Sequence, residues 1–504
     1  MSSKIYPIGI QNFESLRRDN YFYIDKTALI YQMVKTGRYY FLSRPRRFGK
    51  SLLVSTLEAY FLGKKELFTG LAMEKQEKDW INYPVLHLDL NARNYEDADS
   101  LLEELNKNLE IWERTYSSPY SDRAPEERFY HVIRLAYEQT GQRVVILVDE
   151  YDKPMLQAIG NEALQREFRN MLKPFYGVLK TLDGCIKFAL LTGVTKFGKI
   201  SVFSDLNNLN DISMYEPFVS ICGMTEREIH ENLKAELHEL AAAQKMTYEQ
   251  TAAELKECYD GYHFVENTEG IYNPFSVLNT FYKMKFGSYW FETGTPTYLV
   301  ELLKRSHYDL ERMAHVQTDA DVLNSIYGDE DPIPVIFQSG YLTIKGYDKE
   351  FGLYRLGFPN REVEEGFIKF LVPFYTRLSK VEAPFEIQKF VTELRAGDTP
   401  YELVSDLELH YQNVLFIIYK LLGFYVNAER HTSDGRIDLV LQTDRFIYVM
   451  EFKLNGTAEE AMAQINEKGY AQPFEKDGRQ LFKIGVNFSN KTRNIEKWIV
   501  EKQS

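Results

Sequence analysis

Five short apolar runs alternate with longer stretches in which apolar residues recur at helical spacing. The apolar runs cover residues 39–42, 85–91, 144–148, 186–194 and 218–225, and the helix-like stretches cover 98–114, 126–140 and 161–182. Apolar runs of this length, bounded by polar residues, are typical of strands buried on both faces of a parallel sheet. Because helices separate the strands, the pattern predicts an α/β fold with helices on both faces of that sheet.

The pattern becomes helical after Thr225. Residues 226–244 and 248–259 are amphipathic, which predicts a small helical lid. Residues 336–348 and 353–360 indicate a helix end followed by a β-hairpin, as in a winged helix, and without a basic helix we favour packing over DNA binding there. We therefore expect four regions, at residues 1–225, 226–288, 289–385 and 386–504.

The last region has its own sequence of elements. An apolar helix over 401–422 ends at a glycine and precedes three predicted strands at 424–429, 436–442 and 446–454. The dipeptide Asp434-Gly435 is a hairpin signal between the first two strands, and an amphipathic helix follows at 457–468. This order predicts a second, smaller α/β domain.

Composition places the chain among ordinary globular proteins. Its 504 residues are 44% apolar and 26% charged, and this length predicts several domains. Three scattered cysteines suit neither a zinc site nor a disulfide framework, and Cys185 and Cys222 lie in apolar runs typical of a core. With no secretory signal and no apolar stretch long enough to span a bilayer, we expect a cytoplasmic protein without membrane contact. The net charge of −13 gives no overall attraction to nucleic acid, although a local basic groove would be compatible with it.

The first chemical motif is RPRRFGKS, residues 44–51, between the first apolar run and a helix-like stretch. This strand–loop–helix context is what a phosphate-binding loop requires, because backbone N–H groups and the helix N-terminus favour an anion. Lys50 would reach the terminal phosphates and Ser51 would coordinate Mg²⁺. Arg46 and Arg47 would neutralise charge during phosphoryl transfer. The standard loop begins with glycine, a position that Arg44 takes here. The loop residues expected at the nucleotide are Arg46, Arg47, Phe48, Gly49, Lys50, Ser51 and Leu52.

A second motif, VVILVDEYD at 144–152, supplies the acidic partner. Asp149 would end a buried strand at the edge where open α/β sheets bind ligands, and there it would hold Mg²⁺. Glu150 would polarise the attacking water. Thr192 ends the next strand, where it would either sense the γ-phosphate or cap a turn. Lys196 and Lys199 would either contact phosphate or, as we favour, lie solvated on a loop.

A third constellation lies near the C-terminus. Glu451 and Lys453 are two apart on a predicted strand, so their side chains share a face, and Asp438 on the paired strand would meet them there. Two carboxylates and a carbonyl make a Mg²⁺ site, and Lys453 would position or activate the water that cuts a phosphodiester. The alternative is a solvated sheet face with alternating charges. Glu429 would add a ligand, and Gln464 and Tyr470 would face the site from the following helix.

The chain also resembles two known families. The stretches YFYIDKTALI, FLSRPRRFGKSLL, VVILVDEYDKPM, LLTGVTKFGKISVFSDLNNLNDIS, YDGYHF and YNPFSVLNTF resemble the AAA-ATPase-like family of anaerobic and gut bacteria. The stretch GRIDLVLQTDRFIYVMEFKLNGTAEEAMAQINEKGYA is similar to the PD-(D/E)XK nuclease superfamily, with Ile437 at the position of the proline. The resemblance implies a P-loop AAA-like core at 1–225, in which an extra strand separates the two nucleotide motifs, and a nuclease-like domain at 386–504. It also implies ATP as the nucleotide, with Lys50, Ser51, Asp149 and Glu150 in the phosphate and Mg²⁺ roles.

Three hypotheses follow. In the first, the chain is an ATPase whose nucleotide state controls a metal-dependent nuclease acting on DNA or RNA. In the second, ATP drives a switch or scaffold that assembles into a homo-oligomer, and an inactive nuclease fold docks a partner. The third, an interaction protein without chemistry, requires both constellations to be accidental, and the sequence context of each motif argues against it.

Overall fold

The computed structural model describes residues 4–196, 208–292, 299, 302–303, 316–324, 331–375, 427–429, 439–442, 445–474, 477–489 and 494–502. It divides into two compact units. The first comprises residues 1–308 and 315–363, and the second comprises 309–314 and 364–504. Each unit contains its own β-sheet, so the two are described in turn.

A five-stranded parallel sheet forms the centre of the first unit. Its strands are β1 (Tyr39–Ser43), β2 (Val85–Asp89), β3 (Val144–Asp149), β4 (Ile186–Gly193) and β5 (Asn210–Asp211), in the order β2-β3-β4-β1-β5. The first four strands confirm the sequence prediction. Because β4 lies between β1 and β3, the ends of these three strands bring the phosphate loop, the acidic pair and Thr192 to one edge of the sheet.

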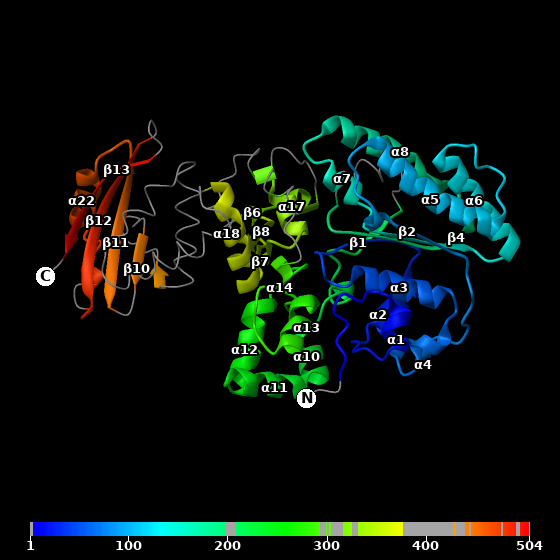
Figure 1. The fold of residues 1–504 in the computed structure, drawn as a ribbon, viewed down its shortest axis with the longest axis horizontal. Helices are drawn as coiled ribbons and strands as arrows, with labels where there is room; N and C mark the ends of the chain where they lie inside the picture. The colour runs from blue at the N-terminus through cyan, green and yellow to red at the C-terminus, as the bar shows by residue number, and fades with distance from the viewer. Residues whose placement is uncertain are drawn as a thin grey trace. The chain divides into compact units, whose positions relative to one another are not determined.

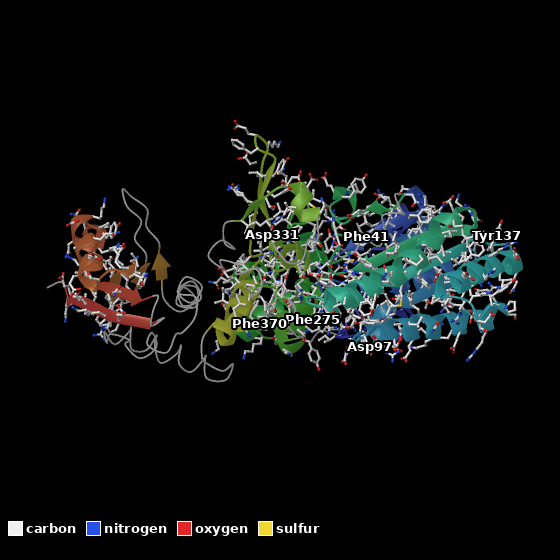
Figure 2. The ribbon with its side chains drawn as sticks, turned by 90° about the horizontal axis from the view of Figure 1, so that it is seen from above. Phe41, Asp97, Tyr137, Phe275, Asp331 and Phe370 are labelled. Carbon is white, nitrogen blue, oxygen red and sulfur yellow. The ribbon has the colours of Figure 1, made fainter. Side chains whose placement is uncertain are left out.

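Helices cover both faces of this sheet (Figure 1). One layer consists of α5 (Ala98–Tyr116), α6 (Pro125–Thr140) and α8 (Glu162–Thr181), and the other of α1 (Phe13–Arg18), α2 (Thr27–Thr36), α3 (Lys50–Phe61) and α4 (Ala72–Gln76). A continuous apolar core fills the space between the sheet and the first layer. Figure 2 shows Phe41 inside this packing and Tyr137 at the surface of α6. The three-layer arrangement is the predicted α/β fold.

The fifth predicted strand, at 218–225, is wrong. The segment is a short 3-10 turn, Glu216–Phe218, followed by bends. Gly223 takes a φ of +86° and its N–H donates to the carbonyl of Phe48 at 3.0 Å. The segment is apolar because it is buried against the phosphate loop rather than in the sheet, where β5 takes the edge position.

The predicted lid helices are present. They are α10 (Glu226–Asn232), α11 (Lys234–Gln244) and α12 (Tyr248–Tyr259), joined by α13 (Pro274–Lys283). Capping boxes at Thr225 and Thr247 begin α10 and α12. The helix predicted over 226–244 is interrupted at Leu233, whose φ and ψ of −124° and 22° are not helical. These helices share an apolar core of their own.

The predicted helix end and hairpin are also confirmed. Helix α17 (Ile333–Gln338) precedes the antiparallel pair β7 (Thr343–Asp348) and β8 (Leu353–Gly357), which β6 (Gln317–Thr318) extends in the order β6-β8-β7. The other described helices of this part are α14 (Tyr289–Glu292), α16 (Ala320–Asn324) and α18 (Arg361–Tyr375).

The second unit contains a mixed sheet. Its order is β13-β12-β11-β10-β9, with bounds Asn494–Lys502, Gln480–Ser489, Phe446–Leu454, Leu439–Gln442 and Asn427–Glu429. Strands β11 and β12 are parallel and the other pairs are antiparallel. Helix α22 (Ala458–Glu467) packs on β11 and β12, as predicted for 457–468. The helix expected at 401–422 and the turn at Asp434-Gly435 lie outside the described residues.

Candidate functional site

The phosphate loop runs from the end of β1 to the start of α3 through two residues in the left-handed backbone region. Arg47 has a φ of +67° and Gly49, which caps α3, has a φ of +97°. Glycine adopts this region freely, whereas a residue with a Cβ such as Arg47 is strained there by about 1 kcal/mol. Helix α3 starts at Lys50, so its first N–H groups face the loop. The local structure is therefore that of an anion site.

Arg44 does not point into this loop. Its side chain is buried, and its guanidinium donates to the carbonyls of Ser213 at 2.7 Å and Phe218 at 3.3 Å and lies 4.0 Å from the Phe264 ring centroid. Burial lowers the pKa of Arg44 to about 10, which leaves the group charged at neutral pH. The residue that replaces the first glycine of the standard loop thus anchors the loop to the segment behind it.

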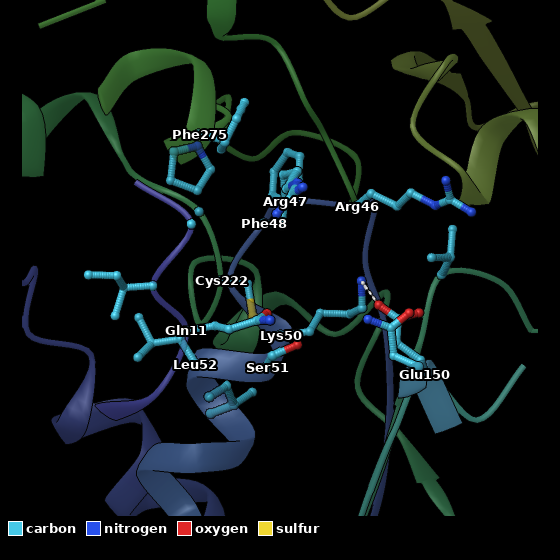
Figure 3. A pocket seen from close by; sticks show the side chains of 18 of the residues that line it. Gln11, Arg46, Arg47, Phe48, Lys50, Ser51, Leu52, Glu150, Cys222 and Phe275 are labelled. Carbon is cyan, nitrogen blue, oxygen red and sulfur yellow. Dashed lines mark ion pairs between the residues drawn. The ribbon is translucent and has the colours of Figure 1, made fainter. Parts of the chain in front are cut away.

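Lys50 and Glu150 meet beside the loop. The Lys50 ammonium lies 3.5 Å from Oε1 of Glu150 and donates to the carbonyls of Arg44 and Pro45 at 3.1 and 3.3 Å. Figure 3 shows this ion pair, with Ser51 next to Lys50 at the start of α3. Glu150 has a φ of +52°, a strained backbone that is often found at functional positions. The Lys50 ammonium can bind a phosphate, and the Glu150 carboxylate can orient a water molecule.

Asp149 and Thr192 lie side by side behind Glu150. The Thr192 hydroxyl donates to Oδ1 of Asp149 at 2.5 Å, and both side chains are buried. The same carboxylate oxygen accepts from the N–H of Glu150 at 3.1 Å. Thr192 therefore fixes the orientation of the Asp149 carboxylate, a contact that the sequence did not predict; its role as γ-phosphate sensor or turn cap stays a prediction.

Asp152 ties the acidic turn to the end of β4. Its buried carboxylate accepts from the N–H and hydroxyl of Thr195 at 2.6 and 2.7 Å and from the N–H of Val194 at 3.2 Å. Burial, together with the negative charge of Glu150, raises the pKa of Asp152 to about 6. The group acts as a rigid link between β3 and β4.

Lys50 and Glu150 border a cleft of about 1190 Å³. Of the predicted nucleotide residues, those from Arg46 to Leu52 line it together with Glu150, whereas Asp149 and Thr192 lie behind its wall. Residues that the sequence reasoning missed also line it. The lining is mixed: its apolar members include Ile8, Ile10, Cys222, Met224 and Leu278, and its polar members include Asn91, Asn94, Lys153, Gln157 and Asn161.

Lys196 corrects one expectation. Its ammonium is buried and pairs with Asp211 at 2.9 Å and with Asn324, so the solvated loop position that we favoured is wrong. Nothing in the sequence around Lys196 indicates its contact with Asn324, which lies far along the chain. Lys199 lies outside the described residues.

A second cluster lies on the sheet of the second unit. Glu451, which is 2% exposed, accepts from Lys453 at 3.4 Å and from the side-chain amide of Gln464. Lys453 also donates to the Gln464 oxygen, and the Gln464 amide lies 3.4 Å from the Tyr470 hydroxyl. The structure therefore brings together four of the residues expected at this site. A carboxylate and a lysine held by one carboxamide can bind and polarise a water molecule.

Gly485 allows this cluster to form. It pairs with Glu451 across β11 and β12, and a Cβ at this position would lie 2.5 Å from the carbonyl oxygen of Ala458 and 2.7 Å from the N–H nitrogen of Met462. Both of these atoms belong to α22. The missing side chain thus lets the helix approach closely enough for Gln464 to contact Glu451.

The remaining expected ligands of this cluster are not placed. Asp438 lies outside the described residues, and for Glu429 the structure describes the backbone of β9 alone. Within the described part of the chain, no group of three or more His, Cys, Asp or Glu side chains has the spacing of a metal site. Among the same residues, no helix combines the length and apolar character needed to cross a bilayer.

Two family models match the chain. One, described as a predicted AAA-ATPase, matches residues 7–203, and the other, described as the PD-(D/E)XK nuclease superfamily, matches residues 406–498. The first range contains the phosphate loop, Glu150, Asp149 and Thr192. The second range contains Glu451, Lys453 and Gln464.

The chain is also similar to a whole curated protein. It is 36% identical to an Azotobacter chroococcum mcd 1 protein titled "Uncharacterized protein in vnfD 5'region", over 99% of both chains. Among solved structures it matches the Aeropyrum pernix ORC2 protein in its ADPNP-ADP complexes, with 12% identity, 71% of this chain and 91% of that chain covered, and a TM-score of 0.23. A score of this size supports no detailed comparison.

Proposed function

The chain belongs to one family with the Azotobacter protein, and from this premise we propose that it binds and hydrolyses ATP and that the nucleotide state regulates a nuclease. The ATP site is the cleft beside the phosphate loop, and the nuclease site is the Glu451–Lys453 cluster, acting on DNA or RNA. The observation that carries the proposal is the meeting of Lys50 and Glu150, at 3.5 Å, in one cleft lined by the phosphate loop.

The lining of the cleft suits a nucleoside triphosphate. The loop and the N-terminus of α3 offer N–H donors, and Lys50 and Arg46 offer positive charge to the phosphates. Apolar lining residues, which include Ile8, Ile10 and Met224, suit the face of a purine base.

The donors near the loop suit Mg²⁺ as well. The Ser51 hydroxyl lines the cleft at the first turn of α3, and the Asp149 carboxylate is held in one orientation by Thr192. Hydroxyl and carboxylate oxygens are the ligands this ion prefers. When bound, Mg²⁺ neutralises charge that develops on the phosphates. Glu150, the residue that follows Asp149, reaches the cleft, where it orients the attacking water and accepts its proton.

In the nuclease-like cluster, Lys453 and Gln464 keep the Glu451 carboxylate in place. We propose that Glu451 and the predicted Asp438 hold Mg²⁺ and that Lys453 orients the water that attacks the phosphodiester. The contacts among Glu451, Lys453 and Gln464 support a chemical role, because an interaction surface does not require a lysine and a buried carboxylate held by one side-chain amide.

The four-region division, with ATPase core, lid, winged-helix-like region and nuclease-like domain, remains part of this proposal, as do assembly into a homo-oligomer and residence in the cytoplasm. Three scattered cysteines without a disulfide pattern support a reducing compartment.

The test measures ATP hydrolysis and cleavage of DNA and RNA by the wild type, Lys50→Ala and Glu451→Ala in the presence of Mg²⁺. Removal of one charge-stabilising group lowers turnover by about 10²–10³-fold. We expect Lys50→Ala to lose ATP hydrolysis and to change cleavage, and Glu451→Ala to lose cleavage while it still hydrolyses ATP. Lys180→Ala, at an exposed lysine on α8, is the control.

A wild-type protein that cuts no nucleic acid under any nucleotide condition contradicts the nuclease half. The scaffold hypothesis then gains if Lys50→Ala alters the oligomeric state while Glu451→Ala behaves as wild type.

A further inference from the structure

A tryptophan from outside the matched ATPase region contacts the phosphate loop. The indole Nε1–H of Trp290 donates to the carbonyl of Arg46 at 3.0 Å, across 244 residues of sequence. Trp290 lies on α14, beyond the range of residues 7–203 that the AAA-ATPase model matches, and it is not part of the cleft lining. The indole therefore holds the loop without being part of the cleft lining.

This hydrogen bond fixes a particular peptide plane. The bond between Arg46 and Arg47 is trans and planar, so the N–H of Arg47 points away from the carbonyl of Arg46. With that carbonyl turned toward Trp290, the N–H of Arg47 is turned away from it, and Arg47 is a cleft residue. The same peptide plane precedes the strained φ of +67° at Arg47, a conformation that needs support from its surroundings.

Trp290 is itself firmly held. Its backbone N–H donates to Oε1 of Glu362 at 2.7 Å, and the other oxygen of Glu362 accepts from the Ser276 hydroxyl at 2.7 Å. Trp290 and Glu362 are 5% and 6% exposed, and the Trp290 ring packs 5.0 Å from the ring of Tyr341. A donor this well restrained loses little entropy when it makes its bond, so the bond can be effective.

A second contact holds the neighbouring residue of the loop. Gly340 has a φ of +86°, and a Cβ there would lie 2.5 Å from Cγ of Pro45. The backbone around Gly340 thus lies directly against Pro45, while Trp290 bonds the next residue, Arg46. Both contacts come from residues C-terminal to the lid, so this part of the chain contacts two consecutive residues of the phosphate loop, Pro45 and Arg46.

We propose that Trp290 is a positioning residue of the ATP site: its bond to Arg46 turns the N–H of Arg47 toward the phosphates. The proposal rests on the ATP binding proposed above. The region after the lid then belongs to the nucleotide site, and ATP binding at the phosphate loop changes the environment of Trp290.

The test compares Trp290→Phe with Trp112→Phe. Phenylalanine keeps an aromatic ring but removes the N–H donor together with part of the indole ring, and Trp112→Phe loses the same ring volume. Trp112 is a buried tryptophan on α5, 5.8 Å from the Phe129 ring, and it is not a cleft residue. A hydrogen bond of about 1 kcal/mol corresponds to about fivefold in affinity, so calorimetry should show ATP binding weakened about three- to tenfold in Trp290→Phe. Trp112→Phe should bind ATP as the wild type does, although both variants lose some thermal stability.

Tryptophan emission gives a second measurement. Addition of ATP with Mg²⁺ should change the emission of the wild type and of Trp112→Phe, and this change should be absent from Trp290→Phe. If Trp290→Phe does not fold, the emission change is measured in Trp80→Phe and Trp498→Phe as well, and a change that persists in all three folded variants is assigned to Trp290. Absence of the change while calorimetry shows binding overturns the proposal.

A folded Trp290→Phe with wild-type ATP affinity also overturns it. If the wild type itself binds no ATP, the proposed function has failed instead, so the two failures are distinguishable.

Discussion

Lys50 and Lys453 each lie close to a glutamate, 3.5 Å from Glu150 in the first unit and 3.4 Å from Glu451 in the second. Their other partners differ in kind. Lys50 donates to two main-chain carbonyls of its own loop, whereas Lys453 donates to a side chain on a neighbouring helix. The first cluster therefore depends on the path of a loop and the second on the distance between a helix and a sheet. Different kinds of substitution should therefore disrupt the two clusters.

The largest effect is expected at the anchor of the loop. Arg44→Gly restores the residue of the standard motif but removes three charged hydrogen bonds to main-chain carbonyls and the ring contact with Phe264. It also leaves buried carbonyls without their donor, so the free energy of unfolding should fall by about 3 kcal/mol in urea denaturation. Arg47→Gly, which removes the same type of side chain from another position of the loop, is the matched control. The backbone there has a positive φ that glycine adopts freely, so the change should be small.

Equal stability of Arg44→Gly and wild type would show that the loop does not need its buried guanidinium.

The next effect concerns the helix–sheet distance in the second unit. Gly485→Ala places a methyl group against the backbone of Ala458 and Met462, which should push α22 away from β11 and separate Gln464 from Glu451. Displacement by about 1 Å at a reacting centre lowers rates by up to about 10²-fold, so nucleic-acid cleavage should drop steeply while ATP hydrolysis persists. Gly478→Ala, in open space on the same unit, should cleave as wild type.

If Gly485→Ala cleaves at the wild-type rate, the close approach of α22 has no role in the chemistry.

A smaller effect is expected at Thr192. Thr192→Val keeps the shape of the side chain and removes the donor to Asp149, so the carboxylate is left less well oriented. A single hydrogen bond of about 1.4 kcal/mol corresponds to about tenfold, and we expect this loss in kcat for ATP hydrolysis with little change in KM. Thr181→Val, an exposed threonine at the end of α8, is the control; similar losses in both variants would contradict the assignment.

The smallest effect is a pH dependence at Asp152, whose pKa is raised to about 6 by burial and by Glu150. An aspartate in the unfolded chain titrates near 3.9, so between about pH 4 and pH 6 the folded protein binds the extra proton. The contribution of Asp152 to the free energy of unfolding therefore falls as pH rises through this window. Asp152→Asn does not titrate in this window. The free energy of unfolding of the wild type, minus that of the variant, should therefore decline by less than about 1 kcal/mol per pH unit as pH rises. A difference that grows with pH would show that the carboxylate is ionised throughout.

The sequence predicted most of the framework because that framework depends on local patterns. Four strands of the first sheet, the long helices and the neighbours Glu451 and Lys453 follow from spacing alone. The strand predicted at 218–225 failed because burial against a loop and burial in a sheet produce the same apolar composition. Its glycine with positive φ, Gly223, was the one local sign of a bend.

Contacts between residues far apart in the sequence could not be predicted from local patterns. Nothing next to Lys196 indicates Asn324, and nothing next to Arg46 indicates Trp290. Arg44 looked like a departure from a motif because the carbonyls that it binds come from residues about 170 positions later along the chain. These contacts exist only in the folded chain, so they need a structure to be seen.

The order of the strands also constrains when the phosphate loop can be completed during synthesis. β1 pairs with β4, so residues 39–43 have no partner on that side until residue 193 has left the ribosome. Trp290 is synthesised about another hundred residues later, which takes about 5–20 s at ordinary rates of translation. A nascent chain thus presents the phosphate loop for several seconds before Trp290 is available to bond Arg46.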